Sequence, residues 1–230
     1  MCSSDLRQTL DALTGLAPEH ISLYALTLEE GTPMHLWAEE GKIPEPDPDL
    51  AADMYQYARD SLAPAGYHHY EISNWSRPGR ACEHNVVYWE NGPYLGVGPG
   101  AHSRLGEYRF WTILSPRDYN SKAASWADAG VQPADEFVEA VLQGVSTLGG
   151  WEHLSQETTC SETMFLGLRL LDGLHLSEAS ARIGVDLAKK FQTPIQECIQ
   201  LGLLERDGDF LKLTKAAYLI ANQAFTRFVE

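Results

Sequence analysis

Runs of apolar residues with two different periods divide the chain into predicted helices and strands. The segment His20–Thr27 is nearly continuously apolar and rich in β-branched and aromatic residues, which predicts a strand buried on both faces. Leucines at helical spacing precede it over residues 6–16, and a second helical face follows over residues 50–62. Tyr67–Trp75 then returns as a strand. This order of helix, strand, helix and strand predicts parallel βα architecture.

The middle of the chain is expected to continue as strands that are separated by turns. The predicted strands are Glu83–Trp89, Tyr94–His102 and Tyr108–Ile113, and the helix that follows them is Pro116–Ala129. Asn91-Gly92 is a hairpin signal between the first two strands. Glycines at positions 96, 98 and 100 leave one strand face bare. Either a neighbouring backbone or a flat ligand should therefore pack closely against that face.

The last third of the chain has a different pattern. Its predicted elements are the helices Ser161–Leu171, Ser177–Ile183 and Leu187–Leu201, a hairpin around Asp207-Gly208, and a last helix Thr214–Phe228. Three helices followed by a hairpin form the outline of a winged helix. A helix over residues 133–148 is expected to join the two parts. We therefore divide the chain into residues 1–130, a linking helix within 131–150, and residues 151–230.

Charge and cysteine spacing narrow the class of protein. The net charge is −15, of which residues 1–150 carry −12 and residues 151–230 carry −3. This excess of acid argues against a general nucleic-acid binder, which needs clustered Lys and Arg. The four cysteines are too far apart for a disulfide framework or a close-spaced thiolate site. With no apolar run of membrane-spanning length and no secretory signal, we expect a soluble, cytoplasmic protein.

The segment HNVVYW at residues 84–89 holds the strongest candidate chemistry. In a strand, His84 and Tyr88 share one face, where they could offer an axial nitrogen and a stacking ring to a macrocycle such as heme. The alternative is that His84 is a histidine of the protein core, hydrogen-bonded to the backbone. From the spacing alone, this structural role is favoured over heme binding. Cys82 with His84, and His69 with Glu71, are weaker thiol–imidazole and acid–base pairs.

Several blocks of this sequence closely resemble the HemW-type heme chaperones, in the coproporphyrinogen III oxidase-like branch of the radical S-adenosylmethionine (SAM) family. The blocks are HISLYALTLEEGTP, GYHHYEISNWSRPGRACEHNVVYW, YLGVGPGAHS, and the C-terminal ETMFLGLRLLDGL and LKLTKAAYLIANQ. The resemblance covers nearly the whole chain from Arg7 onward. It implies an α/β fold, in which the C-terminal part of a partial radical-SAM barrel is followed by a small winged-helix-like helical domain.

The resemblance also implies ligands and site residues. The HN-x-x-YW motif implies heme binding by His84, Asn85, Tyr88 and Trp89. The family's SAM pocket implies cofactor-facing positions at Tyr24, Thr27, Gly98 and Ala101. The implied function is to bind heme and deliver it to a respiratory acceptor protein. A peripheral membrane association would arise only through that partner, and no nucleic acid is implied.

The chain departs from the family pattern at its beginning. The C-x-x-x-C-x-x-C motif, which holds the family's 4Fe–4S cluster with SAM, is absent. We expect an N-terminally truncated fragment that is not catalytic as it stands. Two alternatives stay open. One is an oxygen-independent coproporphyrinogen III oxidase of porphyrin biosynthesis, and the other, ranked last, is a DNA-binding winged helix.

Overall fold

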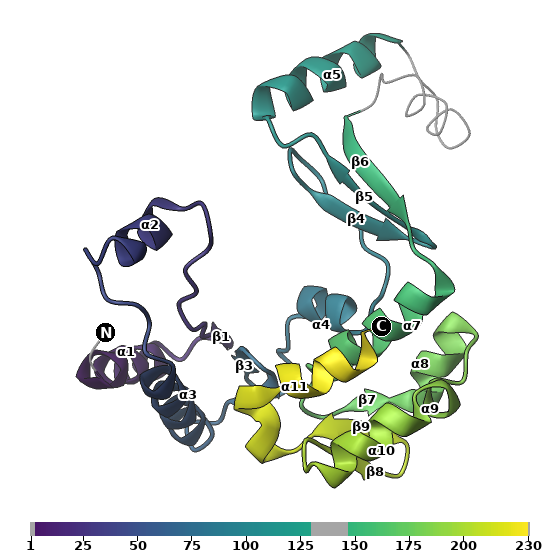
Figure 1. The fold of residues 1–230 in the computed structure, drawn as a ribbon. Coiled ribbons are helices and arrows are strands. Elements are labelled where there is room, and N and C mark those ends of the chain that lie inside the picture. The colour runs from purple at the N-terminus through teal and green to yellow at the C-terminus, as the bar shows by residue number, and fades with distance from the viewer. Residues whose placement is uncertain (1–2, 130–146, 230) are drawn as a thin grey trace.

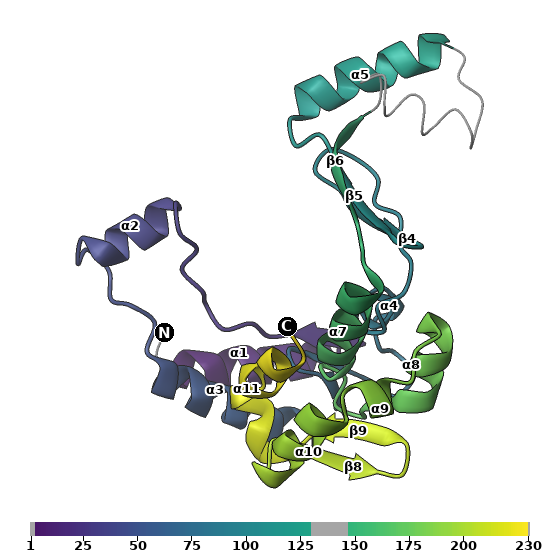
Figure 2. The same ribbon diagram turned by 45° about the vertical axis from the view of Figure 1, so that its right-hand side comes forward.

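A computed structural model describes residues 3–129 and 147–229 of the chain (Figure 1). The described strands form three sheets of three strands each, in the orders β1-β3-β2, β4-β5-β6 and β7-β9-β8, and every pairing in them is antiparallel. The sheet β4-β5-β6 and helix α5 stand away from the other two sheets as an arm (Figures 1 and 2). The predicted linking helix over residues 133–148 lies outside the described residues, except at its end. There, Leu148 begins a strand.

The first sheet belongs to an N-terminal unit with a small apolar core. Its elements are α1 (Ser3–Leu16), β1 (His20–Ser22), α2 (Pro33–Glu39), α3 (Pro48–Leu62), β2 (His68–Glu71) and β3 (Asn74–Ser76). The core between helices and sheet consists of Leu10, Ile21, Ala58, Leu62, Tyr67 and Trp75. The helix α3 begins after Asp47, whose carboxylate accepts hydrogen bonds from the N–H groups of Asp49 and Leu50 at 3.0 and 3.1 Å. The two predicted helical faces are thereby confirmed.

The predicted parallel sheet is wrong in its pairing. Strands β1 and β2 run in the same direction, as a βα repeat requires, but β3 lies between them and pairs with both. The cause is a tight turn at Ile72-Ser73, which splits the predicted strand Tyr67–Trp75 into two antiparallel strands. The predicted strand His20–Thr27 also ends early, at Ser22, and Tyr24 beyond it is 73% exposed.

The segment predicted as the strand Glu83–Trp89 is instead the helix α4 (Glu83–Trp89). A short apolar run fits either structure, and no alternation of burial distinguishes them here. The Asn91-Gly92 pair ends this helix instead of forming a hairpin, with Asn91 in the left-handed region at φ 55°. The prediction that Glu83–Trp89 and Tyr94–His102 form a β-hairpin is therefore wrong.

In the arm, the predicted strand Tyr108–Ile113 and the predicted helix Pro116–Ala129 are confirmed. The elements of the arm are β4 (His102–Leu105), β5 (Tyr108–Thr112), α5 (Pro116–Ala129) and β6 (Leu148–His153). The predicted strand Tyr94–His102 is mainly loop, with an isolated bridge from Tyr94 to Arg104. A side chain at Gly96 would collide with the backbone oxygen of His102. The close neighbour of the bare glycine face is therefore backbone at this position.

The C-terminal region follows the predicted outline of helices and a hairpin. Its elements are α7 (Gln156–Gly167), β7 (Leu174–His175), α8 (Leu176–Ile183), α9 (Leu187–Lys190), α10 (Gln192–Gln200), β8 (Leu204–Asp207), β9 (Phe210–Leu213), η1 (Lys215–Ile220), α11 (Asn222–Phe225) and η2 (Thr226–Phe228). Two predicted helices are broken. The break after Lys190 places Pro194 in the first turn of α10, where its missing N–H costs little. The predicted last helix is the short α-helix α11 with a 3₁₀ segment on each side of it. The domain boundaries remain predictions.

The half-buried histidine of the first sheet, His69, makes the free energy of unfolding depend on pH. His69 stacks on Trp75 with ring centroids 4.0 Å apart, and burial lowers its pKa to about 4. The unfolded chain, with a histidine pKa of about 6.5, takes up the proton first. The stabilisation is therefore complete above about pH 6.5 and is lost as the pH falls toward 4. We expect a loss of roughly 2–3 kcal/mol over this window, allowing for partial exposure.

Urea unfolding at pH 7.5 and pH 4.5 measures this loss. His69→Gln should have a flatter pH dependence than the unsubstituted chain, because it lacks the titrating ring. His84→Gln is the matched control, since His84 is exposed. Equal slopes for all three proteins would show that His69 does not couple folding to proton uptake.

Candidate functional site

The helix α4 presents His84 at the surface and packs its neighbours inward. Residues four apart share a helix face, so His84 pairs with Tyr88 in this helix as it would in a strand, but for a different reason. The two rings are 4.6 Å apart at an angle of 85°, and Tyr88 meets Tyr94 at 4.4 Å in the same edge-on manner. His84 itself is exposed. Its imidazole is therefore accessible to a ligand, and it is supported by two phenol rings in edge-on contact.

Asn85 faces the N-terminal unit and anchors the helix. Its amide donates a hydrogen bond to the Tyr70 hydroxyl at 3.3 Å, and that hydroxyl lies 2.9 Å from Nε2 of His20. Tyr70 is buried, and burial raises its pKa while the hydrogen bond from Asn85 lowers it. The role of Asn85 in the structure is to hold α4 against β1 and β2. Sequence reasoning missed His20 and Tyr70.

Trp89, at the end of α4, meets an arginine from the C-terminal region. The guanidinium carbon of Arg169 lies 4.4 Å from the centroid of the Trp89 ring, a cation–π contact. The indole Nε1 of Trp89 and Nε of Arg169 are both buried and have no hydrogen-bond partner among the described residues. Burial lowers the pKa of Arg169, while the charges of Glu71 and of the Tyr24 phenol oppose this effect. No hydrogen bond, ion pair or ring contact joins Arg169 to Tyr24 among the described residues.

The YEISN segment forms a buried polar cluster next to α4. Glu71 is fully buried, and its Oε1 accepts hydrogen bonds from the backbone N–H of Ser73, at 3.0 Å, and from the Asn74 amide. The Ser22 hydroxyl donates to the side-chain oxygen Oδ1 of Asn74 at 2.5 Å. The other oxygen of Glu71 has no partner among the described residues. His69 bonds to the backbone oxygen of Ile72 instead of facing this carboxylate, because a bulge separates the two positions.

The predicted SAM-facing residues occupy two separate places. Gly98 and Ala101 come together at Thr112, whose hydroxyl donates to the Gly98 oxygen at 2.5 Å and accepts from the Ala101 N–H at 2.9 Å. Tyr24 and Thr27 lie on the exposed segment between β1 and α2. No hydrogen bond joins these two pairs among the described residues. Within the same residues, no three or more His, Cys, Asp or Glu side chains are grouped to hold a metal ion.

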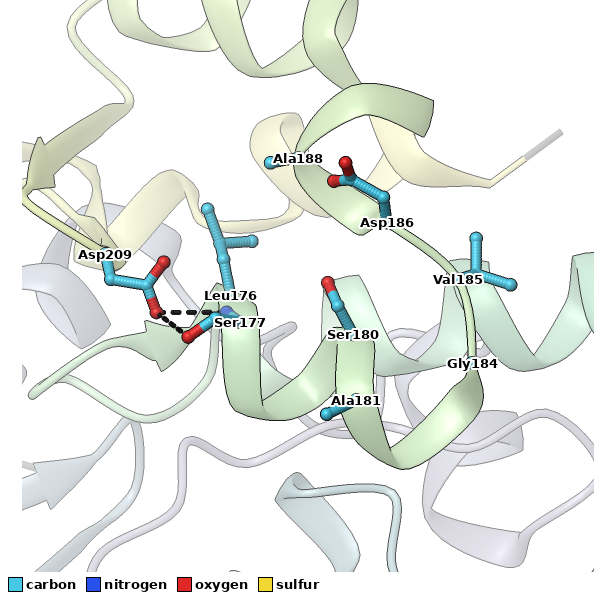
Figure 3. Close-up of a pocket in the computed structure, with 9 residues that line it drawn as sticks. All are labelled: Leu176, Ser177, Ser180, Ala181, Gly184, Val185, Asp186, Ala188 and Asp209. Carbon is cyan, nitrogen blue, oxygen red and sulfur yellow. Dashed lines mark hydrogen bonds between the residues drawn. The ribbon is translucent and has the colours of Figure 1, made fainter.

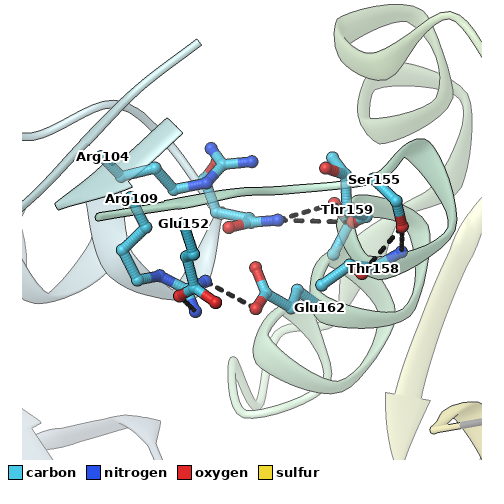
Figure 4. A network of polar contacts seen from close by, with 9 residues as sticks. Arg104, Arg109, Glu152, Ser155, Thr158, Thr159 and Glu162 are labelled. Atoms are coloured by element: carbon cyan, nitrogen blue, oxygen red, sulfur yellow. Dashed lines mark hydrogen bonds and ion pairs between the residues drawn. The ribbon is translucent and has the colours of Figure 1, made fainter. Parts of the chain in front are cut away.

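A polar network fixes the far end of α4 to helix α7 and to the arm (Figure 4). The buried Arg104 donates to the backbone oxygen of Asn91 at 2.5 Å, just after α4. The amide of Asn91 donates to the Thr163 hydroxyl on α7 at 3.1 Å. Arg109 of strand β5 donates to Glu162 of α7 at 2.5 Å. Burial lowers the pKa of Arg104, whereas Glu162 raises that of Arg109 against its burial.

The structure also has a pocket of about 430 Å³ on the C-terminal region, away from α4 (Figure 3). It is lined by Leu176, Ser177, Ser180, Ala181, Gly184, Val185, Asp186, Ala188 and Asp209. Asp209 accepts hydrogen bonds from the Ser177 N–H at 2.9 Å and hydroxyl at 2.7 Å, which lower its pKa. This carboxylate ties the hairpin to the start of α8 and is already satisfied. None of the predicted site residues lines the pocket.

Comparisons with known proteins identify the relatives of this chain. A family profile described as the HemN C-terminal domain matches residues 154–220. The heme chaperone HemW of Mycobacterium tuberculosis H37Rv is 32% identical over 218 residues, which are 95% of this chain and 49% of the relative. HemW of Lactococcus lactis is 31% identical over 229 residues, which are 100% of this chain and 54% of the relative. The chain thus spans about half the length of the curated relatives it matches.

A solved structure shows the same fold. The radical SAM enzyme coproporphyrinogen III oxidase (HemN) from Escherichia coli matches with a TM-score of 0.67 at 17% identity, over 99% of this chain and 52% of that one. These matches define a mixed α/β protein of the HemN type. The chain belongs to the HemW heme chaperone and HemN-like radical SAM family. No helix among the described residues is long and apolar enough to cross a membrane.

Proposed function

We propose that this chain binds heme and serves as part of a chaperone that delivers it to an acceptor protein. The observation that carries the proposal is the exposed imidazole of His84, held on α4 beside Tyr88 within an HN-x-x-YW motif. A neutral imidazole is a common axial ligand of heme iron, and flanking aromatic rings suit a flat macrocycle. The relatives named above are themselves called heme chaperones. The proposed acceptor is a respiratory protein, and the proposed compartment is the cytoplasm.

In this proposal the four motif residues have different roles. His84 is the iron ligand, and Tyr88 and Trp89 are the rings that contact the macrocycle. Asn85 positions the helix through Tyr70 instead of touching the ligand, because its amide is already engaged there.

The other cofactors of the family fit this chain less well. A 4Fe–4S cluster needs cysteine thiolates, and the described cysteines are isolated, with Cys160 and Cys198 buried in the core of the C-terminal region. The described residues therefore do not fit a cluster. For SAM we retain Tyr24, Thr27, Gly98 and Ala101 as the proposed facing positions, together with the proposed barrel half to which they belong.

Hemin titration tests the proposed heme site. The purified chain should develop a Soret band that saturates, and His84→Ala should shift or abolish that band because the axial nitrogen is lost. His153→Ala is the matched control: His153 is also exposed, but lies on β6 beside Glu107. An unchanged spectrum in His84→Ala, with the same affinity, would reject His84 as the ligand.

The likeness to the E. coli oxidase supports a second candidate function, oxygen-independent oxidation of coproporphyrinogen III. A form of the protein extended to the full family length, supplied with SAM and a reductant, would be incubated with coproporphyrinogen III. Robust turnover to protoporphyrinogen would favour the oxidase. Heme binding without turnover would favour the chaperone.

A further inference from the structure

The helix α4 (Glu83–Trp89) is too short to be stable by itself. It has 7 residues, and an isolated helix of fewer than about 12 residues is marginal in water. None of its residues is fully buried, so no apolar face anchors it in a core. Its first turn also lacks a side-chain cap, because Cys82 at the N-cap position makes no such hydrogen bond. The position of α4, and of His84 on it, therefore comes from contacts that other elements make with it.

The two ends of α4 are held unequally. Near its beginning, the Asn85 amide donates to the Tyr70 hydroxyl at 3.3 Å, which is longer than the usual distance of about 3.0 Å. At its end, Arg182 of α8 donates from Nη2 to the backbone oxygen of Glu90 at 2.9 Å. Nη1 of Arg182 lies 3.4 Å from Oε2 of the same glutamate. Arg182 thus binds both the main chain and the side chain of the residue that caps the end of α4.

An arginine suits this end of the helix. The last carbonyl groups of a helix have no partner within it and carry partial negative charge, which a positive donor stabilises. The next residue is held in a similar way, because Arg104 of β4 donates to the backbone oxygen of Asn91 and the Asn91 amide donates to Thr163 of α7. Arg182 and Thr163 both lie within residues 154–220, which match the HemN C-terminal domain. The end of α4 is therefore held from the arm and from that domain.

We propose that Arg182 is a positioning residue for the ligand bound at α4, and that the C-terminal domain thereby controls the proposed heme site. The inference rests on the proposed heme binding at His84. Arg182 acts through the helix and not on the ligand. His84 is on the same short helix, six residues before Glu90, so releasing that end lowers the fraction of molecules with the imidazole in place. The apparent affinity for the ligand falls with this fraction.

Soret titration with hemin and amide hydrogen exchange test the inference on the complete chain. Arg182→Gln should weaken hemin binding roughly 3- to 10-fold and speed the exchange of the α4 amides, because the charged donor to Glu90 is lost. Arg182→Lys should retain part of the affinity, since an ammonium group can still donate to the backbone oxygen. Glu90→Gln should have little effect, because it removes only an exposed ion pair and keeps the backbone contact.

Arg206→Gln is the matched control. Arg206 also donates to a backbone oxygen, that of Gly208 at 3.0 Å, but this contact lies within the hairpin of β8 and β9. The control should bind hemin as the unsubstituted chain does, with unchanged exchange in α4.

Three other results would count against the inference. Unchanged hemin affinity in Arg182→Gln would overturn it, even if the α4 amides exchanged faster. Weaker binding together with faster exchange throughout the C-terminal region would assign Arg182 a general structural role instead. If the unsubstituted chain has no Soret band that depends on His84, both proposals fall. The exchange of α4 in Arg182→Gln then shows whether the arginine holds the helix, which separates a wrong ligand from a wrong contact.

Discussion

Glu162→Ala is expected to destabilise the chain by about 1–3 kcal/mol, the range for leaving a buried hydrogen-bonding group without its partner, because Arg109 is partly exposed and keeps its pair with Glu152. The side chain of Glu162 is 11% exposed, and its Oε1 accepts from Arg109 at 2.5 Å. It also opposes the burial of Arg104, whose pKa is lowered by desolvation. Removing the carboxylate would leave two nearby arginine charges with less compensation. The arm would then lose its main polar attachment to α7.

The helix α7 supplies the control for this experiment. Glu157 is on the same helix and pairs with Lys190 at 3.1 Å, but its side chain is 60% exposed. Glu157→Ala should therefore cost less than about 1 kcal/mol. Urea unfolding at neutral pH would measure both variants. Similar losses for the two would contradict the view that the Glu162 network holds the arm to the C-terminal region.

The elements that sequence reasoning located well are those whose pattern is long and local. The helix over Pro48–Leu62 has an apolar face and a capping aspartate just before it, so one segment carries all the information. The hairpin around Gly208 is similar, because Gly208 adopts the left-handed conformation that the turn requires. In both cases the structure depends little on what packs from elsewhere.

The misassigned segments depend on distant partners. HNVVYW is short enough to form either a strand or a helix. In the fold it is a helix, held by the hydrogen bond from Asn85 to Tyr70 and, two residues beyond its end, by the hydrogen bond from Asn91 to Thr163. The apolar run after Ser22 reads as a buried strand. Among the described residues, however, no neighbouring strand pairs with the part beyond Ser22. An apolar run in the sequence predicts a buried strand correctly only when other elements of the fold cover it.

The sequence predicts the pairing of His84 with Tyr88 in the candidate site, but not the residues from other elements that surround them. The pairing of His84 with Tyr88 was expected from a strand and is met by a helix, because both structures bring the two side chains to one face. Arg169 lies 80 residues after Trp89 in the chain, and only the fold brings them together. Family resemblance supplied the link from HNVVYW to heme, which spacing alone did not favour.

Trp75→Ala is expected to cost about 3–5 kcal/mol, the usual range for deleting a large buried aromatic ring. Trp75 is 1% exposed in the core of the N-terminal unit and covers the ring of His69 at 4.0 Å. The cavity that remains would admit water to that ring. Because burial is what lowers the pKa of His69 to about 4, the variant should raise this pKa toward its ordinary value of about 6.5.

Two measurements on the same variants separate packing from protonation. Urea unfolding gives the loss of stability, and NMR titration of the histidine ring gives its pKa. Trp75→Phe keeps an aromatic ring beside His69 and should lose less stability with a smaller rise in pKa. A strongly destabilised Trp75→Ala in which the His69 pKa stays near 4 would mean that the fold around β2 buries this histidine without help from Trp75. In that case the pH dependence of folding would arise from burial of His69 by the paired strands, not from its stacking on Trp75.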